Sequence, residues 1–215
     1  MKKLLWCGGS HLANSKNAIE SNFSEFDNIF FRTAGPVNLE WFRRGGRYKV
    51  DRDLVLDPRD EKQSYRINQY VKIIFVGQYI NIRRYHADNI LVSRTLYETI
   101  YPHESAPFIL GRNHPLELFF KKFGNKCILL PEPIPISNDE DAKIPLRTHD
   151  FYRRMLWKFC SHYGSTLIGE NFSFLGKDGL TLSIYKGRDS RHCNSRYWDI
   201  RMQDVKKVFQ CPSND

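Results

Sequence analysis

Short, almost entirely apolar segments recur along this chain and constrain its fold more than any other feature. The clearest of them runs from Val71 to Val76, with the sequence Val-Lys-Ile-Ile-Phe-Val, and it stops at Gly77. Such segments lack the polar alternation of a strand with one face in water, so they favour strands buried on both faces of a parallel sheet. Five strands are expected: Lys3–Cys7, Asn28–Arg32, Val71–Val76, Cys127–Leu130 and Thr166–Ile168.

Helical segments separate these strands. In His11–Phe23 the apolar residues recur every three to four positions, which is the spacing of an amphipathic helix. Further helices are expected at Pro115–Phe123, Arg147–Tyr163 and Asp199–Phe209. Residues 44–68 are polar and charged and predict an irregular excursion. The pattern predicts one domain over residues 1–215, an α/β fold in which a three-layer α/β/α sandwich holds a mostly parallel sheet of about five strands.

The chain is basic, with 33 Lys and Arg against 24 Asp and Glu and a formal charge of +9. Its basic residues are scattered as doublets such as Arg43-Arg44 and Lys206-Lys207 and form no longer tract. A nucleic-acid footprint usually gathers on one element or follows a known motif. The distribution therefore favours a solvated basic surface, and nucleic-acid binding stays a lesser alternative.

The number of cysteines and the lengths of the apolar segments indicate the cellular compartment in which the protein is expected. No segment has the roughly 20 apolar residues of a membrane span, and the first residues lack the 7–15 of a signal peptide. The five cysteines are odd in number and include no Cys-x-x-Cys pair, so reduced thiols in the cytoplasm are expected. Without such a pair, a zinc site built from Cys7, His11, His192 and Cys193 is not expected either, and no metal is predicted.

Ser10 is a candidate nucleophile. It follows the first strand and Gly8-Gly9 directly, at the start of a helix. A serine there has its hydroxyl at the edge of the sheet, where the helix N-terminus favours negative charge, as an acyl-transfer site requires. The alternative is that Ser10 only caps the helix, because serine is a preferred N-cap residue.

A histidine and a carboxylate stand three residues apart near the other end of the chain, in Asp189-Ser190-Arg191-His192. A serine nucleophile needs a base, and the base needs an acceptor that fixes its tautomer and stabilises its cation. One short turn can present Asp189 and His192 to the same edge of the sheet. The alternative for His192 taken alone is a surface imidazole.

Together these segments resemble the SGNH/GDSL hydrolase superfamily, whose fold is a flavodoxin-like α/β/α sandwich. Gly8-Gly9-Ser10-His11 is similar to its first block, although the residue before the serine is usually Asp. Asp189 to Asn194 resembles its last block. The resemblance implies that Ser10, His192 and Asp189 form a catalytic triad. It also implies that Gly35, in Thr33-Ala34-Gly35-Pro36, supplies an oxyanion-hole N–H.

The third block departs from the family pattern of Gly-x-Asn-Asp. Here the chain reads Gly77-Gln78-Tyr79-Ile80-Asn81-Ile82-Arg83, closer to a Gly-Glu-Ile-Asp-x-Arg variant, with one residue inserted and both acids replaced by amides. Either Gln78 or Asn81 can supply the side-chain donor to the oxyanion, and the sequence does not choose between them.

The expected function is a serine esterase or O-acyltransferase that acts on acyl groups of carbohydrates or polysaccharide, with a small-molecule or glycan ester as substrate. Hydrolysis by such a site needs no cofactor. His11, Arg83 and Glu132 are candidate substrate-binding residues, and a plain loop carboxylate is the alternative for Glu132. The alternative function is a non-catalytic glycan- or protein-binding module on the same fold. The sequence leaves the oligomeric state open.

Overall fold

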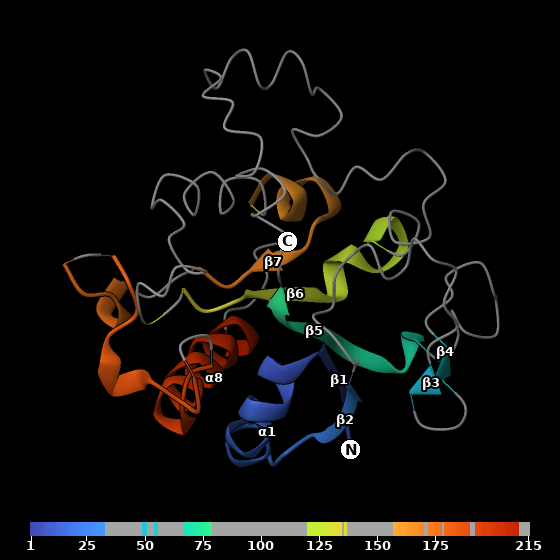
Figure 1. Cartoon of the computed structure of the whole chain (residues 1–215). Coiled ribbons are helices and arrows are strands. Elements are labelled where there is room, and N and C mark those ends of the chain that lie inside the picture. The colour runs from blue at the N-terminus through green and yellow to red at the C-terminus, as the bar shows by residue number, and fades with distance from the viewer. Residues whose placement is uncertain are drawn as a thin grey trace, which may run out of the picture.

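A parallel sheet forms the centre of the molecule in the computed structural model of the chain (Figure 1). The structure describes residues 1–32, 49–50, 54–55, 67–78, 120–134, 136, 157–169, 172–177, 179–189 and 192–210. The strands of the sheet are β1 (Lys3–Gly8), β2 (Asp27–Arg32), β5 (Tyr70–Gln78), β6 (Cys127–Pro131) and β7 (Thr166–Leu167). Their order is β2-β1-β5-β6-β7, and every neighbouring pair is parallel. The predicted α/β class with five parallel strands is confirmed.

The middle residues of the strands are apolar because both faces of the sheet are covered there. Successive side chains of a strand point to opposite faces. In β1, Leu4 and Trp6 belong to one core, whereas Leu5 and Cys7 point to the other side, and all four are fully buried. A segment with two buried faces has no position for a polar side chain.

Two long helices, α1 (Ser10–Asn22) and α8 (Ser195–Gln210), lie side by side on one face of the sheet (Figure 1). Their buried residues, such as Leu12, Ile19 and Met202, pack with Trp6 in one cluster. Helical residues 120–123 and 157–163 lie on the opposite face. There the Phe120 ring lies 5.5 Å from that of Phe75 and 4.8 Å from that of Phe159. The result is the three-layer sandwich that the sequence predicts.

Shorter elements complete the described chain. They are the strands β3 (Lys49–Val50) and β4 (Leu54–Val55) and the 3₁₀ turns η2 (Gly124–Lys126), η4 (Phe172–Phe174) and η5 (Ser183–Tyr185). β3 and β4 pair antiparallel, so the expected excursion at 44–68 is not irregular throughout. In this short ladder Lys49 pairs with Val55 and Val50 pairs with Leu54.

The last helix starts earlier than the sequence pattern predicts, at Ser195 instead of Asp199. Asn194 explains the difference, because its side-chain Oδ1 accepts a hydrogen bond of 3.2 Å from the Tyr197 N–H. Its carbonyl accepts another of 3.3 Å from the Trp198 N–H. Asn194 is thus an N-cap, which ends the preceding loop and directs α8 across the sheet.

Candidate active site

Ser10 stands at the first turn of α1, directly after the carboxyl end of β1. The chain turns tightly here, since a Cβ on Gly8 would lie 2.7 Å from both the Leu12 Cβ and the Val76 carbonyl oxygen. Gly9 is the N-cap residue, and its carbonyl accepts the first helical hydrogen bond, 3.2 Å from the Ala13 N. The alternative prediction that Ser10 is the helix cap is therefore wrong. Its side chain is exposed and free for another role.

Asp189 and His192 are paired as the sequence predicts. The His192 Nδ1 lies 2.7 Å from each carboxylate oxygen of Asp189, and the His192 backbone N–H donates to Oδ1 at 3.0 Å. Arg188 also donates to Asp189, from Nε at 3.2 Å. The His192 side chain is only 13% exposed, so the alternative of a surface imidazole is wrong.

The loop that carries this pair is tightly closed. The Gly187 N–H donates to the His192 carbonyl at 2.7 Å, and Lys186 forms an isolated β-bridge with Cys193. A Cβ on Gly187 would lie 2.5 Å from the His192 carbonyl oxygen, so this close approach requires glycine. The closed loop holds the imidazole and carboxylate in one orientation.

A second imidazole–carboxylate pair lies beside the first. His11 Nε2 is 3.1 Å from Glu132 Oε1, although the two residues are 121 positions apart in the chain. His11 follows β1 and Glu132 follows β6, with β5 between these strands in the sheet. The His11 side chain therefore crosses the end of β5, over Gly77.

Gly77 makes this crossing possible. Its φ is +69°, in the left-handed region that favours glycine. A Cβ on Gly77 would lie 2.7 Å from His11 Cβ and 2.8 Å from His11 Cδ2. From the sequence, Gly77 is predicted only to end a strand and to begin the third block. The sequence did not predict that the His11 imidazole packs against Gly77, and it did not predict the pairing of His11 with Glu132.

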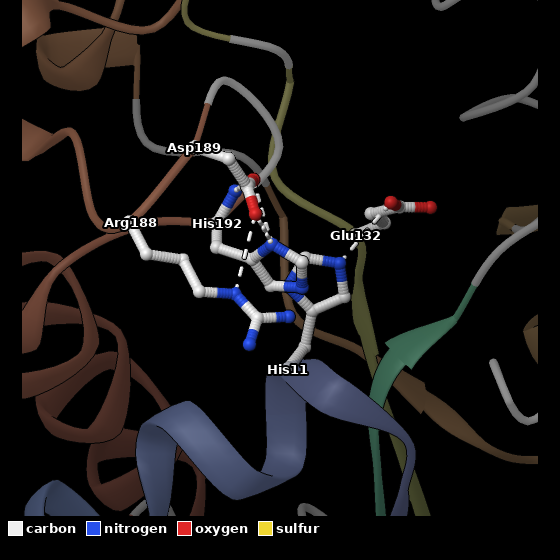
Figure 2. Close-up of polar contacts among 5 residues, drawn as sticks. All are labelled: His11, Glu132, Arg188, Asp189 and His192. Atoms are coloured by element: carbon white, nitrogen blue, oxygen red, sulfur yellow. Dashed lines mark hydrogen bonds and ion pairs between the residues drawn. The ribbon is translucent and has the colours of Figure 1, made fainter. Parts of the chain in front are cut away.

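The two imidazoles contact each other (Figure 2). Their ring centroids are 5.1 Å apart and their planes are tilted by 33°. Figure 2 shows each ring next to its own carboxylate, Asp189 for His192 and Glu132 for His11. The remaining nitrogens, His192 Nε2 and His11 Nδ1, are buried and have no hydrogen-bond partner among the residues that the structure describes.

The structure thus brings together His192 and Asp189, and His11 and Glu132, with Ser10 next to His11 in the chain. Ser10 and His192 are not joined by a hydrogen bond, since the His192 Nε2 has no partner in the described part of the chain. Gln78 is the last residue of β5, at the same edge of the sheet. Gly35, Asn81 and Arg83, the other predicted site residues, lie outside the described residues.

Comparison with solved structures places this site in a known fold. A putative acylhydrolase from Bacteroides fragilis superposes with a TM-score of 0.54 at 12% identity, covering 97% of this chain and 86% of that one. A GDSL-like lipase from Bacteroides thetaiotaomicron gives 0.53 at 11% identity, covering 97% and 88%. The chain has the fold of the GDSL-type hydrolases.

An acetyl xylan esterase is also similar, with a TM-score of 0.51, 11% identity, and coverage of 96% of this chain and 98% of that one. No protein-family model matches the sequence, and no curated protein matches it. The likeness is therefore one of fold, and it confirms the SGNH/GDSL resemblance at that level. In open parallel sheets of this kind, ligands bind at the carboxyl ends of the strands, where Ser10, Glu132 and Gly77 lie.

Three of the described cysteines, Cys7, Cys127 and Cys160, lie in the interior of the fold, whereas Cys193 directly follows His192. Cys7, Cys127, Cys160 and Cys193 are buried and form no disulfide. Burial raises the pKa of the Cys160 thiol to about 12 and that of Cys7 well beyond its ordinary value. Burial also raises the pKa of Cys127, and the neighbouring thiols of Cys7 and Cys160 add to this effect. These three thiols stay protonated at neutral pH and cannot act as nucleophiles.

Two further observations concern metals and membranes. Among the described residues, no three His, Cys, Asp or Glu side chains gather in a group that could hold a metal ion. Within the same part of the chain, no helix is long and apolar enough to span a membrane.

Proposed function

We propose that this chain, acting as one domain over residues 1–215, is a serine esterase or O-acyltransferase for carbohydrate acyl groups. The observation that carries the proposal is the pair of His192 and Asp189. The carboxylate holds Nδ1 at 2.7 Å and leaves Nε2 without a partner among the described residues, at the sheet edge that bears Ser10. An imidazole held in this way has its basic nitrogen available for a hydroxyl.

In the proposed mechanism, Ser10 Oγ attacks the carbonyl carbon of the ester while its proton passes to His192 Nε2. Asp189 stabilises the resulting imidazolium through the hydrogen bond to Nδ1. The tetrahedral intermediate then breaks its bond to the alcohol oxygen, which takes the proton back from Nε2. Water or a sugar hydroxyl attacks the acyl-enzyme by the same steps, so one proton moves onto and off His192 in each half of the reaction.

The negative oxygen of the intermediate needs hydrogen-bond donors that are already in place. The backbone N–H of Ser10 lies in the first turn of α1, where amide groups have no partner within the helix. We assign it to the oxyanion hole together with the Gly35 N–H and the side-chain amide of Gln78 or Asn81. The extra residue and the amide replacements after Gly77 make this the least conventional part of the proposed site.

Two observations favour a carbohydrate substrate. One of the similar structures is an acetyl xylan esterase. Arg83 is a further basic residue close in sequence to the sheet edge and is suited to an acidic sugar. We place His11 in the substrate-binding part of the site, with Glu132 behind it.

The test is hydrolysis of 4-nitrophenyl acetate by the wild type and by the variant Ser10→Ala. We expect the wild type to exceed the variant by about 10³-fold or more in kcat/KM, because loss of the nucleophile removes the covalent route. The ratio is informative even if the wild type is slow. A ratio near one over several acyl esters would contradict the proposal and favour a binding module without catalysis.

A further inference from the structure

The second pair, His11 and Glu132, is not needed for a Ser-His-Asp mechanism. It nevertheless has the features of a built site, since His11 is only 7% exposed and is held at 3.1 Å by a carboxylate from the other side of β5. Nδ1 of His11 is buried with no hydrogen-bond partner among the described residues. Buried polar groups in folded proteins are nearly always paired, so an unpaired one next to a reaction centre points to a ligand.

The carboxylate of Glu132 determines which nitrogen of His11 carries the proton. An ionised carboxylate only accepts hydrogen bonds, so the His11 nitrogen facing it, Nε2, must be the donor. In the neutral imidazole the other nitrogen, Nδ1, then holds a lone pair and acts as an acceptor. The unpaired atom therefore requires an O–H or N–H group as its partner.

The orientation of the ring places this acceptor on the side away from Gly77. The Cδ2 side of the ring lies against Gly77, where an added Cβ would be only 2.8 Å from Cδ2, and Nδ1 is on the opposite side of Cγ. The neighbouring His192 ring is 5.1 Å away, centroid to centroid, and its Nε2 is also unpaired within the described chain. Figure 2 shows the two rings next to each other between the two carboxylates.

We propose that His11 Nδ1 accepts a hydrogen bond from a second hydroxyl of the ligand, adjacent to the alcohol oxygen that His192 serves. This inference rests on the proposed function. It narrows the substrate class to esters of vicinal diols, such as partly acylated polyols or sugars, and makes His11 a specificity-determining residue. Glu132 is a positioning residue, because it acts on the ligand only through the tautomer of His11.

The inference predicts a preference that can be measured. A ligand without the second hydroxyl leaves the buried acceptor unpaired, which costs about tenfold to 100-fold in kcat/KM. The probe pair is glycerol 1-monoacetate, which has the hydroxyl, and propyl acetate, which lacks it. The quantity of interest is the ratio of kcat/KM for these two esters, measured on the same preparation of each protein.

We expect the wild type to prefer the glycerol ester by at least about tenfold, and His11→Phe to lose that preference. Glu132→Gln should reduce it partly, since the amide oxygen still accepts from Nε2 but without charge. The control is His162→Phe, the same replacement at an exposed histidine of the opposite layer, which should keep the wild-type ratio. A merely structural role of His11 would slow both esters alike, and an unchanged ratio in His11→Phe would overturn the inference.

A binding measurement separates this inference from the proposed function and does not need the His11→Phe variant to fold. The ¹⁵N resonance of His11 Nδ1 is followed in Ser10→Ala protein during titration with 1,2-propanediol or 1-propanol. We expect the diol to shift the resonance at a concentration at least about tenfold lower than the mono-alcohol. Equal responses, or no response to either, overturn the inference. Absence of Ser10-dependent turnover with a selective diol response would instead reject only the proposed function.

Discussion

Two kinds of titratable side chain in this fold are little exposed: the imidazoles at the carboxyl edge of the sheet and the thiols within its core. Their neighbours differ. His192 has a carboxylate oxygen at 2.7 Å, and His11 has one at 3.1 Å. Cys7 and Cys127 are fully buried and Cys160 is 2% exposed, and burial raises the pKa of all three. Cys7 lies inside the sheet, and His11, only four positions later in the chain, lies just beyond it.

The two kinds of side chain differ in their partners, since the thiols are buried in the core whereas each imidazole is hydrogen-bonded to a carboxylate. Desolvation is the largest cause of the raised pKa of each of these thiols, and for Cys127 the charge of Lys72 offsets only part of it. At the sheet edge, each imidazole has a carboxylate beside it, Asp189 for His192 and Glu132 for His11. We therefore propose that acid–base chemistry takes place at this edge and not at the thiols.

The largest effect should come from removing the imidazole of the first pair. His192→Ala is expected to lower kcat on 4-nitrophenyl acetate by about 10³-fold or more, because the proposed mechanism uses His192 as the base for Ser10. His162→Ala, at an exposed position, serves as the control and should keep wild-type turnover. If the two variants retain similar activity, His192 is not the base, and the proposed acid–base role of the sheet edge is wrong.

Asp189→Asn should cost less than loss of His192, on the order of 10²-fold in kcat. The amide can still hold the ring but does not stabilise the imidazolium that forms during the reaction. Because the Asp189 side chain is 44% exposed, water already screens part of its charge. Steady-state kinetics at several pH values measures the effect. A loss equal to that of His192→Ala would mean that the variant misplaces the ring.

Gly77→Ala should impair the second pair while sparing the first. The new Cβ would meet His11 within 2.7 Å, and φ is +69°. Gly164→Ala is the matched control, because Gly164 has a φ of +66° but nothing within 4 Å of its Cβ. Both carry the left-handed backbone cost of about 1–2 kcal/mol. We expect Gly77→Ala to lower Tm by several degrees more than Gly164→Ala and to reduce the preference for glycerol 1-monoacetate over propyl acetate. Thermal melts of both variants and kinetics with the two esters measure these effects.

The thiols should have no effect on turnover at neutral pH and a defined effect on stability in alkali. Cys160 ionises near its ordinary value of 9.0 in the unfolded chain but near 12 in the folded one. Its contribution to stability is therefore complete below pH 9 and is lost as the pH rises toward 12. Urea unfolding of the wild type and Cys160→Ser at pH 8 and pH 10 tests this. The stability advantage of the wild type should shrink at pH 10, and an advantage independent of pH would contradict the raised pKa.

Sequence patterns predicted the parts of the molecule that depend on neighbouring residues. The apolar strands are local features, and so is the pairing of Asp189 with His192, because three residues suffice for one turn. The start of α8 was placed four residues late, although Asn194 is itself an N-cap signal. The apolar spacing predicts a start at Asp199, whereas the hydrogen bonds to Asn194 set the observed start at Ser195.

The parts that escaped prediction depend on contacts between distant segments. Glu132 pairs with His11 because β1 and β6 both border β5, and no local pattern encodes that order. Gly77 looks like an ordinary strand end until the imidazole above it is known. The sequence did place all three residues at one edge of the sheet, which is the signal from which the pairing could have been sought.

The most direct test of the central claim is covalent labelling of the native protein with a fluorophosphonate. Such a reagent forms an Oγ–phosphorus bond and releases fluoride only at a serine whose proton is taken by a neighbouring base. Peptide mass spectrometry of the wild type, Ser10→Ala and His192→Ala would locate the adduct. Our account predicts one adduct per chain at Ser10 in the wild type and loss of labelling in both variants. Labelling of Ser10 that persists in His192→Ala, or an unlabelled wild type, would contradict it.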